Sequence, residues 1–169
     1  MGSTLNKVAK AAALSLATVA FTSTASAQSL EGFYAGAFIQ NDFGKAPGTG
    51  LDGALGVWAG YNYGVGNGFI VGAEAEVQYD WATSVVPAGS AFTGLLNARA
   101  GYAFSDSFML YGKGGAGFMS GAGLVYDFGV GGEAAFAGNY MVRGEVVRVM
   151  GAGMTRNRTD FKVGVGYKF

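Results

Sequence analysis

The chain has no cysteine and no histidine among its 169 residues, and it has only two prolines. Without cysteine it can form no disulfide, thiolate nucleophile or cysteine-linked lipid anchor. Without histidine it has no imidazole base and no Cys/His zinc site. These absences exclude disulfide-stapled scaffolds, zinc fingers and His-dependent hydrolases.

Charge is also scarce, at 13% of residues, which is about half the share of an ordinary protein. The 11 basic and 11 acidic residues cancel, so no basic stripe indicates a nucleic-acid partner. Glycine (31 residues) and aromatic residues (14%) are abundant instead. The scarcity of proline argues against a disordered Gly/Pro tract.

The first segment predicts a secretory signal peptide, residues 1–27. Its basic start, apolar core and small-residue cleavage site are Lys7 with Lys10, residues 11–21, and Ala25 with Ala27. The apolar core is too short for a membrane-spanning helix, which needs about 20 residues. Cleavage before Gln28 leaves residues 28–169 as one domain of 142 residues (169 − 27), with a net charge of −2 (9 − 11).

We expect the mature protein to begin at Gln28, because Ala25 and Ala27 satisfy the small-residue requirement of the cleavage site. The intact mass of protein purified from cell envelopes measures this. A mass that still includes the first 27 residues would contradict both the cleavage and the export.

The mature chain alternates apolar residues with small or polar ones, the period of half-buried strands. In residues 69–81, for example, Val71, Ala73 and Val77 share one face, whereas Glu74, Glu76 and Gln78 share the other. The eight predicted strands are 32–40, 53–63, 68–81, 91–104, 108–119, 124–136, 140–150 and 159–169. Tight turns such as 64–67 alternate with mostly longer connections, as an up-and-down meander requires.

A soluble lipocalin-like barrel and a membrane barrel both fit this alternation. Three features favour the membrane: aromatic residues crowd the strand ends near the tight turns, the face opposite the apolar one is rich in Gly, Ala, Asn and Gln, and the chain stops on an aromatic at a strand end. The sequence therefore predicts an all-β, eight-stranded antiparallel transmembrane barrel behind a cleavable signal peptide.

Short segments along the whole mature chain resemble the small outer-membrane β-barrel family, which includes OmpA-like transmembrane domains and opacity-type surface antigens of Gram-negative bacteria. They are GFYAGAFIQ (32–40), GVWAGYNYG (56–64), VGAEAEVQYDW (71–81), LNARAGYAF (96–104), LYGKGGAGF (110–118) and FKVGVGYKF (161–169). The resemblance implies an outer-membrane location, periplasmic termini and loops outside the cell. This sequence departs in its modest loops and in having nothing after the last strand.

The most specific part of the resemblance is the end of the chain, where Tyr167 and Phe169 are similar to the signal read by the barrel-assembly machinery. The resemblance therefore implies that machinery as a partner during biogenesis. Outer-membrane lipid and lipopolysaccharide are the other expected partners, and we expect a monomer.

The predicted inward face carries four acids and four bases at similar depth, counted from the nearest tight turn or the C-terminus. They are Glu74, Glu76, Arg99, Lys113, Glu133, Arg143, Glu145 and Lys162. We expect a net-neutral lumenal network with Glu74 and Glu76 beside Arg99, Glu133 between Lys113 and Arg143, and Glu145 beside Lys162. In a narrow barrel such a network cross-links strands and blocks ions.

Catalysis and cofactor binding have little support. Glu74 and Glu76 lie about 7 Å apart by strand rise, a usable carboxylate spacing, but balancing interior bases explains them better. The string 112–117 matches a dinucleotide fingerprint without following a strand or opening a helix. Trp58 is expected to fill the lumen. We predict no enzyme, no cofactor and no metal.

Arg148 breaks the pattern, because counting from Val142 and Val146 puts it on the lipid face. Two explanations remain open at this stage: the side chain extends to lipopolysaccharide phosphates, or a bulge turns it inward.

The sequence thus favours a structural or surface-antigen barrel with a closed lumen. A porin-like channel is the alternative, and an adhesin is a weaker one.

Overall fold

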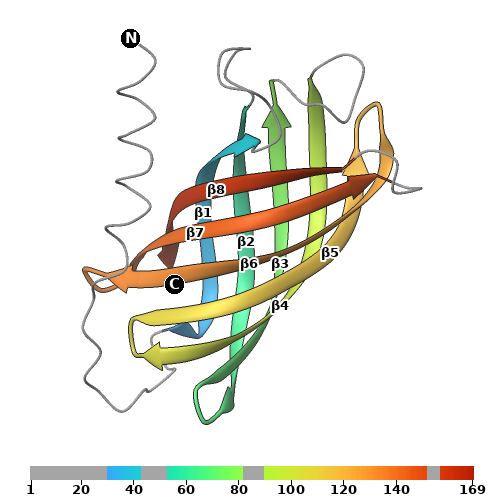
Figure 1. Cartoon of the computed structure of the whole chain (residues 1–169). Coiled ribbons are helices and arrows are strands. Elements are labelled where there is room, and N and C mark those ends of the chain that lie inside the picture. The colour runs from blue at the N-terminus through green and yellow to red at the C-terminus, as the bar shows by residue number, and fades with distance from the viewer. Residues whose placement is uncertain (1–29, 43–52, 82–89, 152–156) are drawn as a thin grey trace, which may run out of the picture.

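The computed structural model describes residues 30–42, 53–81, 90–151 and 157–169, and these form a closed antiparallel barrel (Figure 1). Each strand pairs with its neighbours in sequence, and β1 closes the barrel against β8. The strands are β1 (Gly32–Asp42), β2 (Gly53–Gly66), β3 (Phe69–Asp80), β4 (Ala91–Ser105), β5 (Phe108–Met119), β6 (Gly123–Phe136), β7 (Tyr140–Gly151) and β8 (Asn157–Lys168). The predicted fold class is confirmed, with every strand end within three residues of its expected position. The predicted signal peptide lies outside the described residues.

The first tight turn differs from the prediction. The sequence placed it at 64–67, but β2 runs on to Gly66 and the turn is Asn67–Gly68, with φ of +53° and +81°. A two-residue hairpin turn of this kind needs a positive φ at both central residues, which Asn and Gly tolerate best. The pairing slips between Gly64 and Gly66, so the longer strand absorbs the extra residue as an irregularity.

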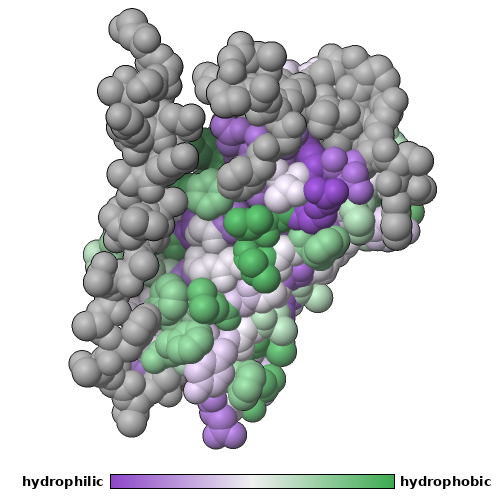
Figure 2. Space-filling view, viewed as in Figure 1, coloured by the Kyte–Doolittle hydropathy of each residue, from purple (hydrophilic) through white to green (hydrophobic). Residues whose placement is uncertain are grey.

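The outer surface of the barrel is apolar. Large side chains that point outward are well exposed, among them Leu96 (71%) and Phe118 (70%). Figure 2 shows apolar and neutral residues over much of the visible wall, with hydrophilic ones mainly near its upper end and at the lower tip. Such a surface is unfavourable in water and favourable in lipid. The barrel is therefore the membrane barrel and not the soluble lipocalin-like one. No helix among the described residues is long and apolar enough to cross a membrane.

Outward-facing aromatic rings form a band at each end of the barrel. At the end with the tight turns, Phe69 packs against Tyr102 at 5.1 Å between ring centroids, and Tyr140 against Tyr167 at 5.4 Å. At the opposite end Trp81, Phe92, Phe118, Tyr126 and Phe128 are exposed. The sequence pattern indicated only the band near the tight turns. Two bands are what the two membrane interfaces favour.

The lumen is filled by side chains in layers. Near the tight turns an apolar cluster contains Leu30, Ile70, Ala103, Met109 and Tyr111. Toward the other end a second one contains Ala91, Leu95, Met119, Val125, Val147 and Val149. The Trp58 ring fills part of the lumen as expected. It fits there because Gly36 and Gly164 have no Cβ to collide with it. The abundant glycine therefore makes room for rings inside a narrow barrel.

Candidate functional site: a charge belt across the lumen

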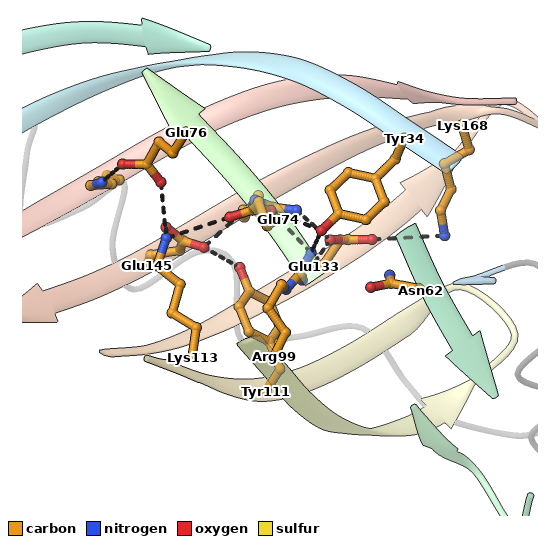
Figure 3. A network of polar contacts seen from close by, with 12 residues as sticks. Tyr34, Asn62, Glu74, Glu76, Arg99, Tyr111, Lys113, Glu133, Glu145 and Lys168 are labelled. Carbon is orange, nitrogen blue, oxygen red and sulfur yellow. Dashed lines mark hydrogen bonds and ion pairs between the residues drawn. The ribbon is translucent and has the colours of Figure 1, made fainter. Parts of the chain in front are cut away.

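All eight predicted lumenal charges point inward and are buried, with 0 to 6% of each residue exposed. They come from strands β3 to β8, and Figure 3 shows six of them, Glu74, Glu76, Arg99, Lys113, Glu133 and Glu145, with their side chains directed toward one another. We call this set the charge belt; it consists of Glu74, Glu76, Arg99, Lys113, Glu133, Arg143, Glu145 and Lys162. Period-two alternation on strands β3 to β8 places every one of these side chains on the inner face.

Two arginines and two glutamates form the densest part of the belt. Glu74 Oε2 accepts from Arg143 Nη1 at 2.6 Å and from Arg99 Nη1 at 3.3 Å. Glu133 Oε2 lies 3.1 Å from Arg99 Nη2 and 3.1 Å from Arg143 Nη2. Each guanidinium thus bridges both carboxylates. Because Glu74 is on β3 and Arg143 on β7, this ring ties together strands on opposite sides of the barrel.

The two lysines extend the belt from this ring. Lys113 Nζ lies 3.0 Å from Glu76 Oε2, 3.0 Å from Glu145 Oε2 and 3.5 Å from Glu74 Oε1. Lys162 pairs with Glu76 and also donates to Gln78 Oε1 at 3.3 Å. All four acids and all four bases therefore belong to one connected network.

Two of the expected pairings hold only in part. Glu133 does not lie between Lys113 and Arg143, because in the β5–β6 ladder it is opposite Met109, whereas Lys113 is opposite Gly129. Glu133 pairs with Arg99 and Arg143 instead. Glu145 is beside Lys162 in the β7–β8 ladder, yet the Lys162 ammonium crosses the lumen to Glu76.

Four inward aromatic residues line the belt. The Tyr34 hydroxyl donates to Glu74 at 2.9 Å and accepts from Arg99 at 2.6 Å, and Tyr111 donates to Glu145 at 2.5 Å. The Arg99 guanidinium lies 3.9 Å from the Tyr111 ring centroid, and that of Arg143 lies 4.4 Å from Trp58. Lys162 Nζ is 4.6 Å from the centroid of Phe38. Tyr34, Tyr111 and Phe38 were not predicted to line the belt, although alternation alone places them inward.

Further buried charges lie beyond the predicted eight. Lys168 Nζ is 3.7 Å from Glu133 Oε1, on the side of the tight turns. On the other side Arg158 pairs with Asp80 at 2.7 Å and with Asp160 at 2.9 Å. Asp80 also accepts from Gln78 and from Thr93. The signal that could have found them is the same inward register on β3 and β8.

Every acid of the belt lies within ion-pair distance of at least two bases. Glu74 and Glu76 both face the Lys113 ammonium, and each carries a second cation. Among the described residues no group of three or more acids is arranged to hold a metal ion. The dinucleotide-like string 112–117 lies within β5, and so it cannot open a helix toward a phosphate.

The remaining predicted residues lie at the barrel surface or outside the described chain. Tyr167 faces outward and packs between the rings of Tyr140 and Phe169. Phe169 is 77% exposed, and its amide donates to the carbonyl of Phe33 at 2.9 Å. The cleavage-site residues Ala25, Ala27 and Gln28 lie outside the described residues. Arg148 points outward in an unbroken register with both neighbouring strands, so the bulge explanation is wrong.

Comparison with known proteins agrees with this architecture. Over 71 residues the chain is 35% identical to the 31 kDa outer-membrane immunogenic protein of Brucella melitensis, a match that covers 36% of this chain and 30% of that protein. The chain thus spans less than a third of that relative's length. The same identity and coverage hold for the Brucella suis protein of that name.

Solved structures resemble the barrel at low identity, which shows the fold alone. The N-terminal barrel of Pseudomonas aeruginosa OprF matches with a TM-score of 0.55 and 14% identity, over 81% of this chain and 96% of that one. Ail, the attachment invasion locus protein of Yersinia pestis, matches with a TM-score of 0.54 and 19% identity over the same shares. The family model described as outer membrane protein beta-barrel domain matches residues 11–169. The chain belongs to this outer-membrane β-barrel family.

Proposed function

We propose that this protein is a structural outer-membrane barrel with a closed lumen, which presents its loops as a surface antigen and transports no solute. The observation that carries the proposal is the charge belt, in which eight buried side chains connect across the lumen. An ion entering there must break pairs that have little access to water. The name of the Brucella relatives, an outer-membrane immunogenic protein, supports the antigenic part.

Apolar layers on either side of the belt support the same proposal. Met109 and Ile70 are buried on the side of the tight turns, and Met119 and Val125 on the other. A permeant ion would also lose hydration beside these apolar side chains. The buried Asp80, Arg158 and Asp160, which are level with the second cluster, are already paired with one another. We further propose a monomer with periplasmic termini, embedded among outer-membrane lipid and lipopolysaccharide after insertion by the barrel-assembly machinery. We propose no enzymatic role and no cofactor.

Single-channel recording tests closure. We expect negligible conductance from the refolded wild-type protein in a planar bilayer, because the belt and the apolar layers obstruct the lumen. Arg99→Ala is expected to give brief openings, since it frees Glu74 and Glu133 of one shared cation. Stable, high-conductance openings of the unmutated protein would refute the closed barrel and establish the alternative, a porin-like channel for small solutes.

An adhesin remains the weaker alternative. Ail is named as an attachment invasion locus protein, but at 19% identity its role does not transfer to this chain. A barrel that is only structural or antigenic should leave cell attachment unchanged when its gene is deleted. Loss of attachment on deletion, restored by the wild-type gene, would favour the adhesin.

A further inference from the structure

Arg148 is the single charged side chain on the outward face of the eight described strands. All other charged residues within these strands occupy inward positions, where most belong to the charge belt or to the Asp80–Arg158–Asp160 cluster. Arg148 is instead level with Phe128 on β6 and Thr159 on β8 in the two adjoining ladders. An outward arginine on a membrane barrel needs a partner, and the outward face of the described strands carries no residue of opposite charge.

The local contacts of Arg148 leave most of its donors available. Its Nη1 donates to Thr159 Oγ1 at 2.8 Å, and no carboxylate among the described residues pairs with it. The bond to Thr159 holds the guanidinium against β8 and leaves Nε and Nη2 for another acceptor. Asn157 is the first residue of β8 and is exposed on the same face as Thr159. It adds a side-chain amide on the side away from the tight turns.

The position of Arg148 along the strand sets its depth in the membrane. It lies three residues before Gly151, the end of β7, which is about 10 Å of strand and less along the barrel axis because strands tilt. This is the end opposite the tight turns, at the level of the aromatic band that includes Phe128 and Tyr126. Headgroup phosphates lie at this level, within reach of a long arginine side chain.

We propose that Arg148 and Thr159, with Asn157 beside them, form a binding site on the barrel wall for a phosphate group of lipopolysaccharide lipid A. The guanidinium offers two N–H groups to phosphate oxygens, a geometry that arginine matches well. The neighbouring Phe128 and Phe161 present apolar surface for the acyl chains below the phosphate. The site depends on the proposed orientation, with the long connections outside, because lipopolysaccharide occupies the outer leaflet.

The test measures binding of defined lipids to the full mature barrel in a neutral detergent. Bisphosphorylated lipid A, chemically dephosphorylated lipid A and phosphatidylglycerol are titrated separately, and bound lipid is counted by native mass spectrometry. We expect saturable one-site binding of the phosphorylated lipid A, about tenfold weaker in Arg148→Met and intermediate in Arg148→Lys. Thr159→Val should also weaken it, since the guanidinium loses its anchor.

Leu96→Met, on the far side of the wall, is the matched control and should bind like the wild type. Equal binding of phosphorylated and dephosphorylated lipid A by the wild type would overturn the site without any variant. Equal binding of phosphatidylglycerol would show a general headgroup contact and overturn the assignment to lipid A. Complete displacement of lipid A by millimolar inorganic phosphate would likewise show a site for free phosphate and overturn the assignment to lipid A. Closure of the lumen is measured separately, so failure here leaves the conductance result standing.

Discussion

Replacing Glu74 with glutamine is expected to lower the free energy of unfolding by about 3–5 kcal/mol, the range for removing one member of a buried ion network. Glu74 is the hub of the belt, with Arg143 at 2.6 Å, Arg99 at 3.3 Å, Lys113 at 3.5 Å and the Tyr34 hydroxyl at 2.9 Å. The amide keeps the volume and removes the charge, so several cations lose a shared partner at once. Urea unfolding of protein refolded into phospholipid vesicles, followed by tryptophan fluorescence, measures the change.

Two further variants separate the charge effect from general damage. Asp106→Asn removes an acid from the exposed β4–β5 turn and should change stability by less than about 0.5 kcal/mol. Glu74→Gln combined with Arg143→Gln should cost less than the sum of the two single changes, because the second removes a charge that the first left uncompensated. Strict additivity, or a change in Glu74→Gln no larger than in Asp106→Asn, would show that lumenal water replaces the missing partner.

The faces of the strands could be predicted from sequence, but the partners across the lumen could not. Alternation alone assigns Glu74, Arg99 and Arg143 to the inner face, because each strand has only two faces. Which charges then meet depends on strand tilt and on closure of the sheet, which bring β3 opposite β7. Counting depth from the tight turns treats Glu133 and Lys113 as neighbours, although their ladder positions are well apart.

The aromatic residues of the belt escaped prediction for a different reason. Outward aromatic residues are the expected feature of a membrane barrel, so the inward rings of Tyr34 and Tyr111 were not considered as partners of the lumenal charges. Their inward register and the neighbouring small residues were the available signals: Gly60 leaves room for the Tyr34 ring, and Gly131 for the Tyr111 hydroxyl. The residues Asn67 and Gly68 likewise indicated a tight turn, but the register shift in the β2–β3 ladder placed that turn later than predicted.

Replacing Phe169 with aspartate is expected to reduce the amount of protein in the outer membrane about tenfold or more while leaving the folded barrel nearly as stable as the wild type. The resemblance of Tyr167-Lys168-Phe169 to the terminal assembly signal predicts the first effect. The second follows from the structure, because the Phe169 ring is 77% exposed and contacts Tyr167 edge-on at 5.3 Å. Its backbone bond to Phe33 survives the substitution. A charge near the interface costs only about 0–1 kcal/mol.

Comparing two quantities makes this prediction decisive: the protein level in isolated outer membranes, and the unfolding free energy of the same variant refolded from urea. Phe136→Asp is the matched control, since Phe136 is an exposed ring in the same aromatic band but not at the chain end. It should share the small stability cost without the loss of membrane level, and Phe169→Tyr should behave like the wild type. A normal membrane level of Phe169→Asp would show that assembly does not read this residue. If Phe136→Asp lowers the outer-membrane level equally, the cause is a charge in the aromatic band and not the position of Phe169 in the sequence. That outcome would contradict the terminal signal.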